Sequence, residues 1–205
     1  MRDKSLCIVA PIFYEIAHVI VRSDSPYQSI SDLQGQPVAI GPPKSGSRST
    51  AKMIFESLEL DCREVEVRGW SELNRPSAPD AAVICVRAKS RLVSELINSR
   101  QWRLLSIPDA DHVCQRHPTL RTMKISPEDY PKAQLDGNVD TVRTTCFLVA
   151  RYDAAGDLID ATLDAIYSSP PIITNLIPPE SAAETLKKMD CHPATEAFFE
   201  KFEQP

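Results

Sequence analysis

Short apolar runs alternate with helix-like periodic segments along most of this chain. The runs at 38–40 and 81–86 are apolar at every position, which is typical of strands buried on both faces of a parallel sheet. Between them, apolar residues recur at the spacing of an amphipathic helix, at Ala51, Ile54, Phe55 and Leu58. The pattern predicts an α/β fold with mostly parallel sheet and flanking helices. We expect 38–40 and 81–86 to be adjacent, parallel strands of one sheet.

The same alternation extends toward both ends of the chain. It predicts further strands at 7–10, 18–22, 65–67, 104–107 and 144–150. It predicts further helices at 92–97, 158–166, 182–189 and 194–202. We expect one α/β lobe at 23–138, with the flanking pieces 1–22 and 139–205 packed together as a second unit.

Composition narrows the range of functions. The chain has 205 residues, of which 42% are hydrophobic and 25% charged, as in ordinary globular domains. Its formal net charge is −5 and no basic stripe is visible, which argues against a nucleic-acid partner. No apolar run approaches the ~18 residues of a membrane-spanning helix. Six scattered cysteines without a C-x-x-C pair permit disulfides but do not indicate them.

The best local signal for binding is the segment 40–50, where a strand runs into a glycine-containing loop and then a helix. Free N–H groups at a helix N-terminus suit a carboxylate or phosphate, and Ser45 and Ser47 add hydroxyl donors. Lys44 or Arg48 supplies positive charge. A serine that merely caps the helix fits the same residues. A nucleotide-binding P-loop does not fit, because Ser47 stands where that motif requires lysine.

Metal and catalytic chemistry have weaker support. The densest group of metal-ligand residue types is Asp109, Asp111, His112, Cys114 and His117. On a helix, Asp111, Cys114 and His117 share a face, but surface helices also carry such residues by chance. His18 and His192 fit packed or capping histidines better than catalytic bases, and no catalytic motif is present. We therefore predict no enzymatic activity, no metal and no cofactor.

Several segments, taken in order, resemble the TAXI-type solute receptors of TRAP transporters. HVIVR at 18–22 resembles the family's H-V-V-V-R strand, and DLQGQ at 32–36 resembles its D-L-K-G-K turn. GPPKSGS at 41–47 resembles its G-P-P-G-S-G-T loop. Later segments follow in the family's order, at 102–107, 130–131, 142, 148–151 and 191–194. The resemblance covers nearly all of the chain.

The resemblance implies a type II periplasmic-binding-protein fold, with two lobes that enclose a small carboxylate or an amino acid such as glutamate. In that fold, 23–138 is the second lobe, and 1–22 with 139–205 form a partial first lobe with the hinge strands. It also implies an extracytoplasmic location and the membrane subunits of a TRAP transporter as partners. The residues at 45–47 are then the carboxylate cradle, while Tyr14 and Glu15 are expected to hold an amino or hydroxyl group. The candidate ligand-binding residues are Ser45, Gly46, Ser47, Tyr14, Glu15, Arg87 and Tyr130.

Two departures from the family lead to an alternative. The family has a longer N-terminal segment, and ICVRA at 84–88 replaces a G-x-P stretch that helps line its cleft. We therefore expect the first lobe to be incomplete and to expose an apolar face. Either two copies pair as a homodimer through that face, or the cleft is open and incomplete and binds a carboxylate weakly or not at all. The alternative function is a ligand-sensing or scaffolding domain of a longer, membrane-attached protein that no longer serves transport.

Overall fold

The computed structural model describes residues 5–99, 101–133, 135–167, 173 and 175–202. The chain divides into a larger unit, Glu15–Thr144, and a smaller unit, Met1–Tyr14 with Thr145–Pro205. The division falls inside two long strands, β1 (Leu6–Arg22) and β7 (Val139–Arg151), which each run from one unit into the other. The boundaries expected from the sequence, after Arg22 and before Val139, lie at the ends of the same two strands.

The larger unit is built on a sheet with a parallel part at one edge. Its other strands are β2 (Pro37–Ala39), β3 (Arg63–Val65), β4 (Ala81–Val86), β5 (Trp102–Leu105) and β6 (Arg121–Ile125). β2 lies between β3 and β4 and is parallel to both, with Val38 opposite Ala81. This register confirms the predicted adjacency of the two fully apolar runs. In the rest of the sheet, β1 is antiparallel to β4 and β5, and β6 is antiparallel to β7.

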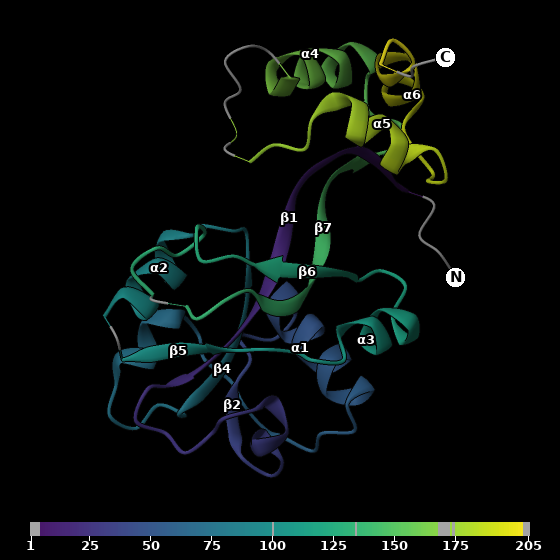
Figure 1. Ribbon diagram of the computed structural model, residues 1–205. Coiled ribbons are helices and arrows are strands. Elements are labelled where there is room, and N and C mark those ends of the chain that lie inside the picture. The colour runs from purple at the N-terminus through teal and green to yellow at the C-terminus, as the bar shows by residue number, and fades with distance from the viewer. Residues whose placement is uncertain (1–4, 100, 134, 168–172, 174, 203–205) are drawn as a thin grey trace. The chain divides into compact units, whose positions relative to one another are not determined.

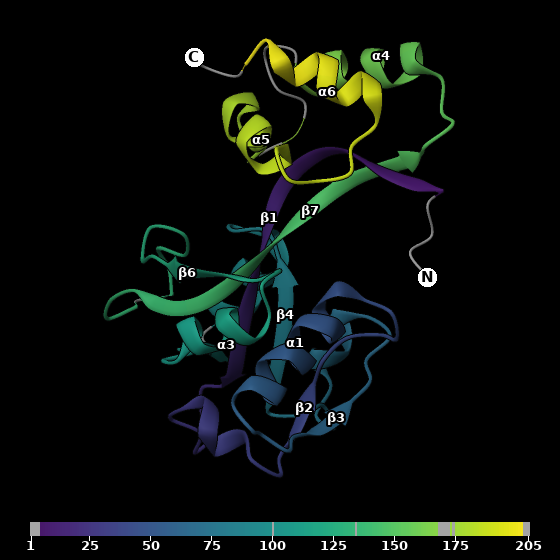
Figure 2. The ribbon, with the colours of Figure 1, turned by 90° about the vertical axis from the view of Figure 1, so that its right-hand side faces the viewer.

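Helices cover both faces of this sheet, as the sequence predicts. The α-helices of the larger unit are α1 (Gly46–Ser57), α2 (Arg91–Asn98) and α3 (Ala110–Arg116), and two 3₁₀ helices lie at Ile30–Leu33 and Trp70–Asn74. Side chains alternate along β4: Val83 and Cys85 pack in one apolar cluster with α1 and α3. Ala82 and Ile84 pack in a second cluster with α2. Figure 2 shows α1 lying along β4.

The smaller unit has its own apolar core. Its helices are α4 (Gly156–Tyr167), α5 (Pro179–Leu186) and α6 (Pro193–Glu200), which Figure 1 shows gathered together. Their apolar sides pack on Val9, Ala10 and Ile12 of β1. Every large apolar side chain that is exposed in the described part of the chain belongs to this unit: Leu6, Val149, Tyr152, Leu158 and Met189.

Two strand predictions need correction. β1 is one continuous strand of 17 residues, where the sequence predicts separate strands at 7–10 and 18–22. Pro11 and the half-buried Tyr14 and Glu15 interrupt the apolar run without interrupting the strand. The strand β6 has no counterpart in the prediction, because its residues are largely polar and exposed.

Candidate functional site

The loop between β2 and α1 has a constrained backbone. Gly41 has a φ of +83°, and a Cβ atom there would lie 3.0 Å from Ser45 Oγ and 3.3 Å from Trp70 Cζ2. Lys44 also adopts a left-handed conformation, with a φ of 65°. Ser45 is the N-cap of α1, and its Oγ accepts a hydrogen bond from the Arg48 N–H at 3.2 Å. Ser45 therefore caps α1, and this cap fixes the loop that positions Gly46 and Ser47.

The hydroxyl of Ser47 is bound to the sheet. Ser47 is buried, and its Oγ accepts from the Cys85 N–H at 2.9 Å and lies 3.3 Å from the Cys85 carbonyl oxygen, to which it donates. In the described part of the chain the pairing of β2 with β4 ends at Ala82, so the serine hydroxyl takes the place of a strand partner for Cys85. A ligand at this loop would meet the backbone N–H of Ser47 and not its hydroxyl.

Two backbone donors at the start of α1 remain available. Among the described residues, none accepts a hydrogen bond from the N–H groups of Gly46 and Ser47. The next two N–H groups are already used, since Arg48 donates to Ser45 Oγ and Ser49 donates to Ser45 O. The free donors carry the partial positive charge of the N-terminus of a helix of 12 residues.

Glu15 lies beside these donors. It is the first residue of the larger unit, and a Cβ atom on Gly46 would lie 3.4 Å from Glu15 Oε2. Burial raises the pKa of the Glu15 carboxyl above its ordinary value. The site therefore combines unused N–H donors with a half-buried carboxylate.

The cationic side chains around the loop differ in whether they already form ion pairs. Arg48 forms an ion pair with Glu64 at 3.0 Å, and Lys52 contacts the same carboxylate at 3.2 Å. Lys44 is exposed and forms no ion pair with any residue that the structure describes. Of the two cations named from the sequence, Lys44 is the one left to face a ligand.

Arg87 follows the end of β4 on the side of Glu15. Ile16 is paired with Val86 in the antiparallel register of β1 and β4, and extending this register places Arg87 across from Glu15. The Arg87 side chain is exposed. The register therefore brings a second cation to the same end of the sheet.

Tyr130 lies on the opposite face of the sheet from the loop. It packs in the cluster that contains Ile84 and α2, whereas Ser47 is bound to Cys85 on the face of α1. Its hydroxyl lies 2.8 Å from His18 Nε2, and the tyrosine is 2% exposed. The structure thus brings together Gly46, Ser47 and Glu15 but leaves Tyr130 in the core.

The other sequence candidates have separate places. Tyr14 is the last residue of the smaller unit and is half-buried. His192 caps α6, because its Nδ1 accepts from the Ala194 N–H at 3.2 Å. His18 is fully buried. The packed and capping roles predicted for the two histidines are confirmed.

Trp70 is a site residue that the sequence analysis misses. It begins the 3₁₀ helix Trp70–Asn74, is half-buried, and its ring lies against Gly41 in the loop. In the sequence it is a lone aromatic residue in a polar stretch, so no periodic pattern marks it. It gives the loop an apolar wall.

The rest of the described chain adds three findings. No group of three His, Cys, Asp or Glu side chains within it is arranged to hold a metal ion. None of its helices has the length and apolar character needed to cross a membrane. All six cysteines are free thiols.

Comparison with known proteins yields a family match and structural likenesses. The sequence pattern of the NMT1-like family matches residues 2–201. The chain is similar to the ABC transporter periplasmic binding protein from Brucella ovis with glutathione bound, at 13% identity and a TM-score of 0.46, over 91% of this chain and 49% of that one. It is similar to the arginine-, lysine-, histidine-binding protein ArtJ from Geobacillus stearothermophilus, at 11% identity and a TM-score of 0.44, over 80% of this chain and 58% of that one.

A third solved structure is similar over less of its length. It is the periplasmic aliphatic sulphonate binding protein SsuA from Escherichia coli, at 15% identity and a TM-score of 0.41, over 68% of this chain and 40% of that one. The chain spans about half the length of the solved proteins to which it is similar.

Proposed function

The chain belongs to the NMT1-like family, and we propose that it is an extracytoplasmic solute-binding protein that takes a small amino acid, such as glutamate, at the start of α1. One observation carries the proposal: the unused N–H donors of Gly46 and Ser47 lie beside the carboxylate of Glu15. Donors for an anion and an acceptor for a cation are the two groups that an amino acid requires.

The ligand carboxylate is held by the two N–H groups and by the helix dipole. Its ammonium group is held by Glu15, which is half-buried and therefore less screened by solvent than a surface carboxylate. Lys44 and Arg87 supply positive charge for a second, side-chain carboxylate of the ligand. Trp70 covers the carbon chain.

The arrangement favours an amino acid over a simple dicarboxylate. A ligand without an ammonium group places its carboxylate near Glu15 with nothing to offset the like-charge repulsion. Glutarate has the two carboxylates of glutamate but lacks the amino group. We expect the protein to bind glutamate at least about tenfold more tightly than glutarate, since a hydrogen bond to a charged group contributes ~1.5–3 kcal/mol.

The role proposed for Glu15 makes the affinity for glutamate depend on pH. Because burial raises the pKa of Glu15, its carboxylate takes up a proton at a higher pH than an exposed glutamate does. Protonation removes the charge that holds the ammonium group. The affinity for glutamate therefore falls as the pH is lowered through this raised pKa, and a Glu15→Gln variant loses that dependence.

Calorimetric titration with glutamate and with glutarate tests the proposal. Gly46→Ala places a methyl group between the donors and Glu15 while leaving an ordinary contact, so it should abolish binding and leave the unfolding free energy within about 1 kcal/mol of wild type. Gly156→Ala is the matched control, because Gly156 also begins a helix and its added Cβ meets Ala194 at 3.9 Å. Glu15→Gln should remove the preference for glutamate. Wild-type affinity in Gly46→Ala would show that the ligand does not sit at this loop.

The assignment to a TRAP-type system rests on the resemblance at 18–22, 32–36 and 41–47. Its partners are then the membrane subunits of such a transporter. Co-expression with candidate TRAP and ABC membrane subunits, followed by a transport assay with labelled glutamate, distinguishes the two systems. Uptake that depends on the TRAP subunits supports the assignment, and uptake through ABC subunits alone contradicts it.

A further inference from the structure

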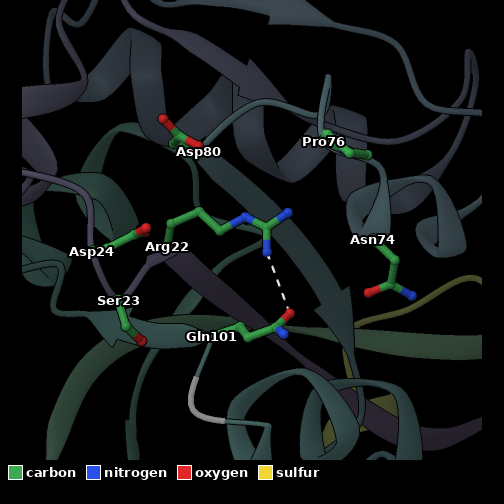
Figure 3. A pocket seen from close by; sticks show the side chains of 7 residues that line it. All are labelled: Arg22, Ser23, Asp24, Asn74, Pro76, Asp80 and Gln101. Atoms are coloured by element: carbon green, nitrogen blue, oxygen red, sulfur yellow. Dashed lines mark hydrogen bonds between the residues drawn. The ribbon is translucent and has the colours of Figure 1, made fainter.

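A cavity of about 580 Å³ opens in the larger unit at the end of β1 that is distant from the α1 loop. Arg22 at the end of β1, Asp80 before β4, and Gln101 before β5 line it, together with Asp24 and Asn74 (Figure 3). At roughly 3.3 Å per strand residue, Arg22 lies about 23 Å from Glu15 along β1. The cavity is therefore separate from the site proposed above.

Arg22 is held rigidly at the cavity. Its guanidinium lies over the Trp102 ring at 4.4 Å from the centroid. One terminal nitrogen donates to the Leu73 carbonyl at 2.8 Å, and the other approaches Gln101 Oε1 at 3.5 Å. These contacts use two of the five N–H donors that a guanidinium carries and fix the direction of the others. In Figure 3 the side chain points toward the side that Asn74 lines and away from Asp24 and Asp80.

Within the described part of the chain, none of the charged side chains that line the cavity forms an ion pair. Arg22 forms no ion pair with any carboxylate among the described residues, although its neutral partners hold it in place. Asp24 and Asp80 are exposed, and neither forms an ion pair within the described chain. The cavity therefore presents one fixed cation and two carboxylates.

We propose that this cavity is a second binding site, which takes a basic amino acid. A ligand with one carboxylate and two ammonium groups is the charge complement of one guanidinium and two aspartates. The α-carboxylate is held by the free edge of Arg22, which presents fixed, forked donors suited to a carboxylate. The two ammonium groups are held by Asp24 and Asp80, while Asn74 and Gln101 add neutral hydrogen-bonding groups to the cavity wall. This inference is independent of the function proposed for the α1 loop.

The test is a titration of the full chain with lysine, followed by NMR of the side-chain amide signals of Asn74 and Gln101. Norleucine lacks the side-chain ammonium group, and cadaverine lacks the carboxylate. We expect lysine to shift both amide signals saturably, and each analogue to bind at least about tenfold more weakly, as the loss of one charged contact predicts.

Asp24 and Asp80 are suitable positions for test variants, because both are exposed and replacing them should not disturb the fold. Asp24→Asn with Asp80→Asn should weaken lysine binding about a hundredfold, roughly tenfold for each lost carboxylate. Glu15→Gln, a change at the α1 loop, should leave the affinity for lysine unchanged. Failure of the proposal for the cavity is therefore distinguishable from failure of the proposal for the α1 loop. Unmoved Asn74 and Gln101 signals, equal binding of the three compounds, or undiminished binding in the double aspartate variant would each overturn the proposal.

Discussion

At the scale of single residues, a buried polar pair fixes β1 in the larger unit. His18 is fully buried, with Nδ1 3.3 Å from the Ile84 carbonyl oxygen and Nε2 2.8 Å from the Tyr130 hydroxyl. The two rings meet edge to face at 5.6 Å. Burial lowers the pKa of His18 to about 4 and raises that of Tyr130, so both side chains are neutral near pH 7.

The lowered pKa of His18 predicts a loss of stability in mild acid. The unfolded chain protonates this residue near pH 6.5, whereas the folded chain resists protonation down to about pH 4. The unfolded state therefore binds more protons between these values. The contribution is fully present above pH 6.5 and is lost as the pH falls toward 4, by about 3 kcal/mol in total.

Urea denaturation of the wild type and of His18→Gln between pH 7 and pH 4 measures this contribution. The difference in unfolding free energy between the two should change by about 3 kcal/mol across the range, because glutamine does not titrate. His112→Gln is the control, since His112 is exposed and should keep the wild-type profile. Parallel profiles for the wild type and His18→Gln would contradict the buried, neutral state of His18.

Two glycines with similar backbone angles provide a test of the loop. Gly41 and Gly35 have φ values of +83° and +70°, but a Cβ on Gly41 meets Ser45 and Trp70 while one on Gly35 meets nothing within 4 Å. Gly35→Ala should cost ~1 kcal/mol for the left-handed backbone alone. Gly41→Ala should cost at least ~1 kcal/mol more because of the contacts. Equal values in thermal or chemical denaturation would mean that the loop is not packed as described.

At the scale of elements, Ser47 joins α1 to β4. Removing its hydroxyl leaves the buried N–H of Cys85 without an acceptor. Ser47→Ala should therefore lower the unfolding free energy by ~2 kcal/mol. Ser49→Ala, an exposed position whose hydroxyl donates to Ser45 O, should change it by less than ~0.5 kcal/mol. A neutral Ser47→Ala would show that the joint between α1 and β4 contributes little.

The parallel part of the sheet was predictable because burial on both faces leaves an uninterrupted apolar run in the sequence. Ala81–Val86 is apolar throughout, and the helices on either side of it have clear periodicity. The same logic fails for β1, where Pro11 sits inside a strand and half-buried residues separate two apolar runs. It also fails for β6, whose exposed polar residues are indistinguishable from a loop. These two segments are strands because they pair with neighbouring strands, and their own residue composition does not reveal that pairing.

The candidate site was predictable only as far as its loop. Glycine and serine between a strand and a helix mark a cap and a possible anion contact, and the structure has that cap at Ser45. The register of β1 on β4 brings Glu15 beside this loop. A 3₁₀ helix that is distant in the sequence brings Trp70 to the same loop. Tyr130 was a candidate only through the resemblance to TAXI-type receptors, and its side chain packs in the cluster of Ile84 and α2, on the other face of the sheet from the loop.

At the scale of the whole molecule, the exposed apolar residues suggest self-association. Leu6, Val149 and Tyr152 are 54%, 51% and 58% exposed, and the Tyr152 N–H donates to Ser5 O at 2.8 Å, so they lie at neighbouring strand ends. We expect the protein to be a homodimer by light scattering and Val149→Lys to be a monomer. Ser71→Lys adds the same charge at an exposed site in the larger unit and should stay dimeric. A monomeric wild type at high concentration would contradict this expectation.

The central claim is that the start of α1 receives the carboxylate of an amino acid. The most direct measurement follows the backbone amide signals of Gly46 and Ser47 by NMR while glutamate is added. We predict that both signals move downfield and saturate at the calorimetric affinity, because a carboxylate then accepts from N–H groups that have no other acceptor among the described residues. Glutamate binding that leaves these two signals in place would contradict the account.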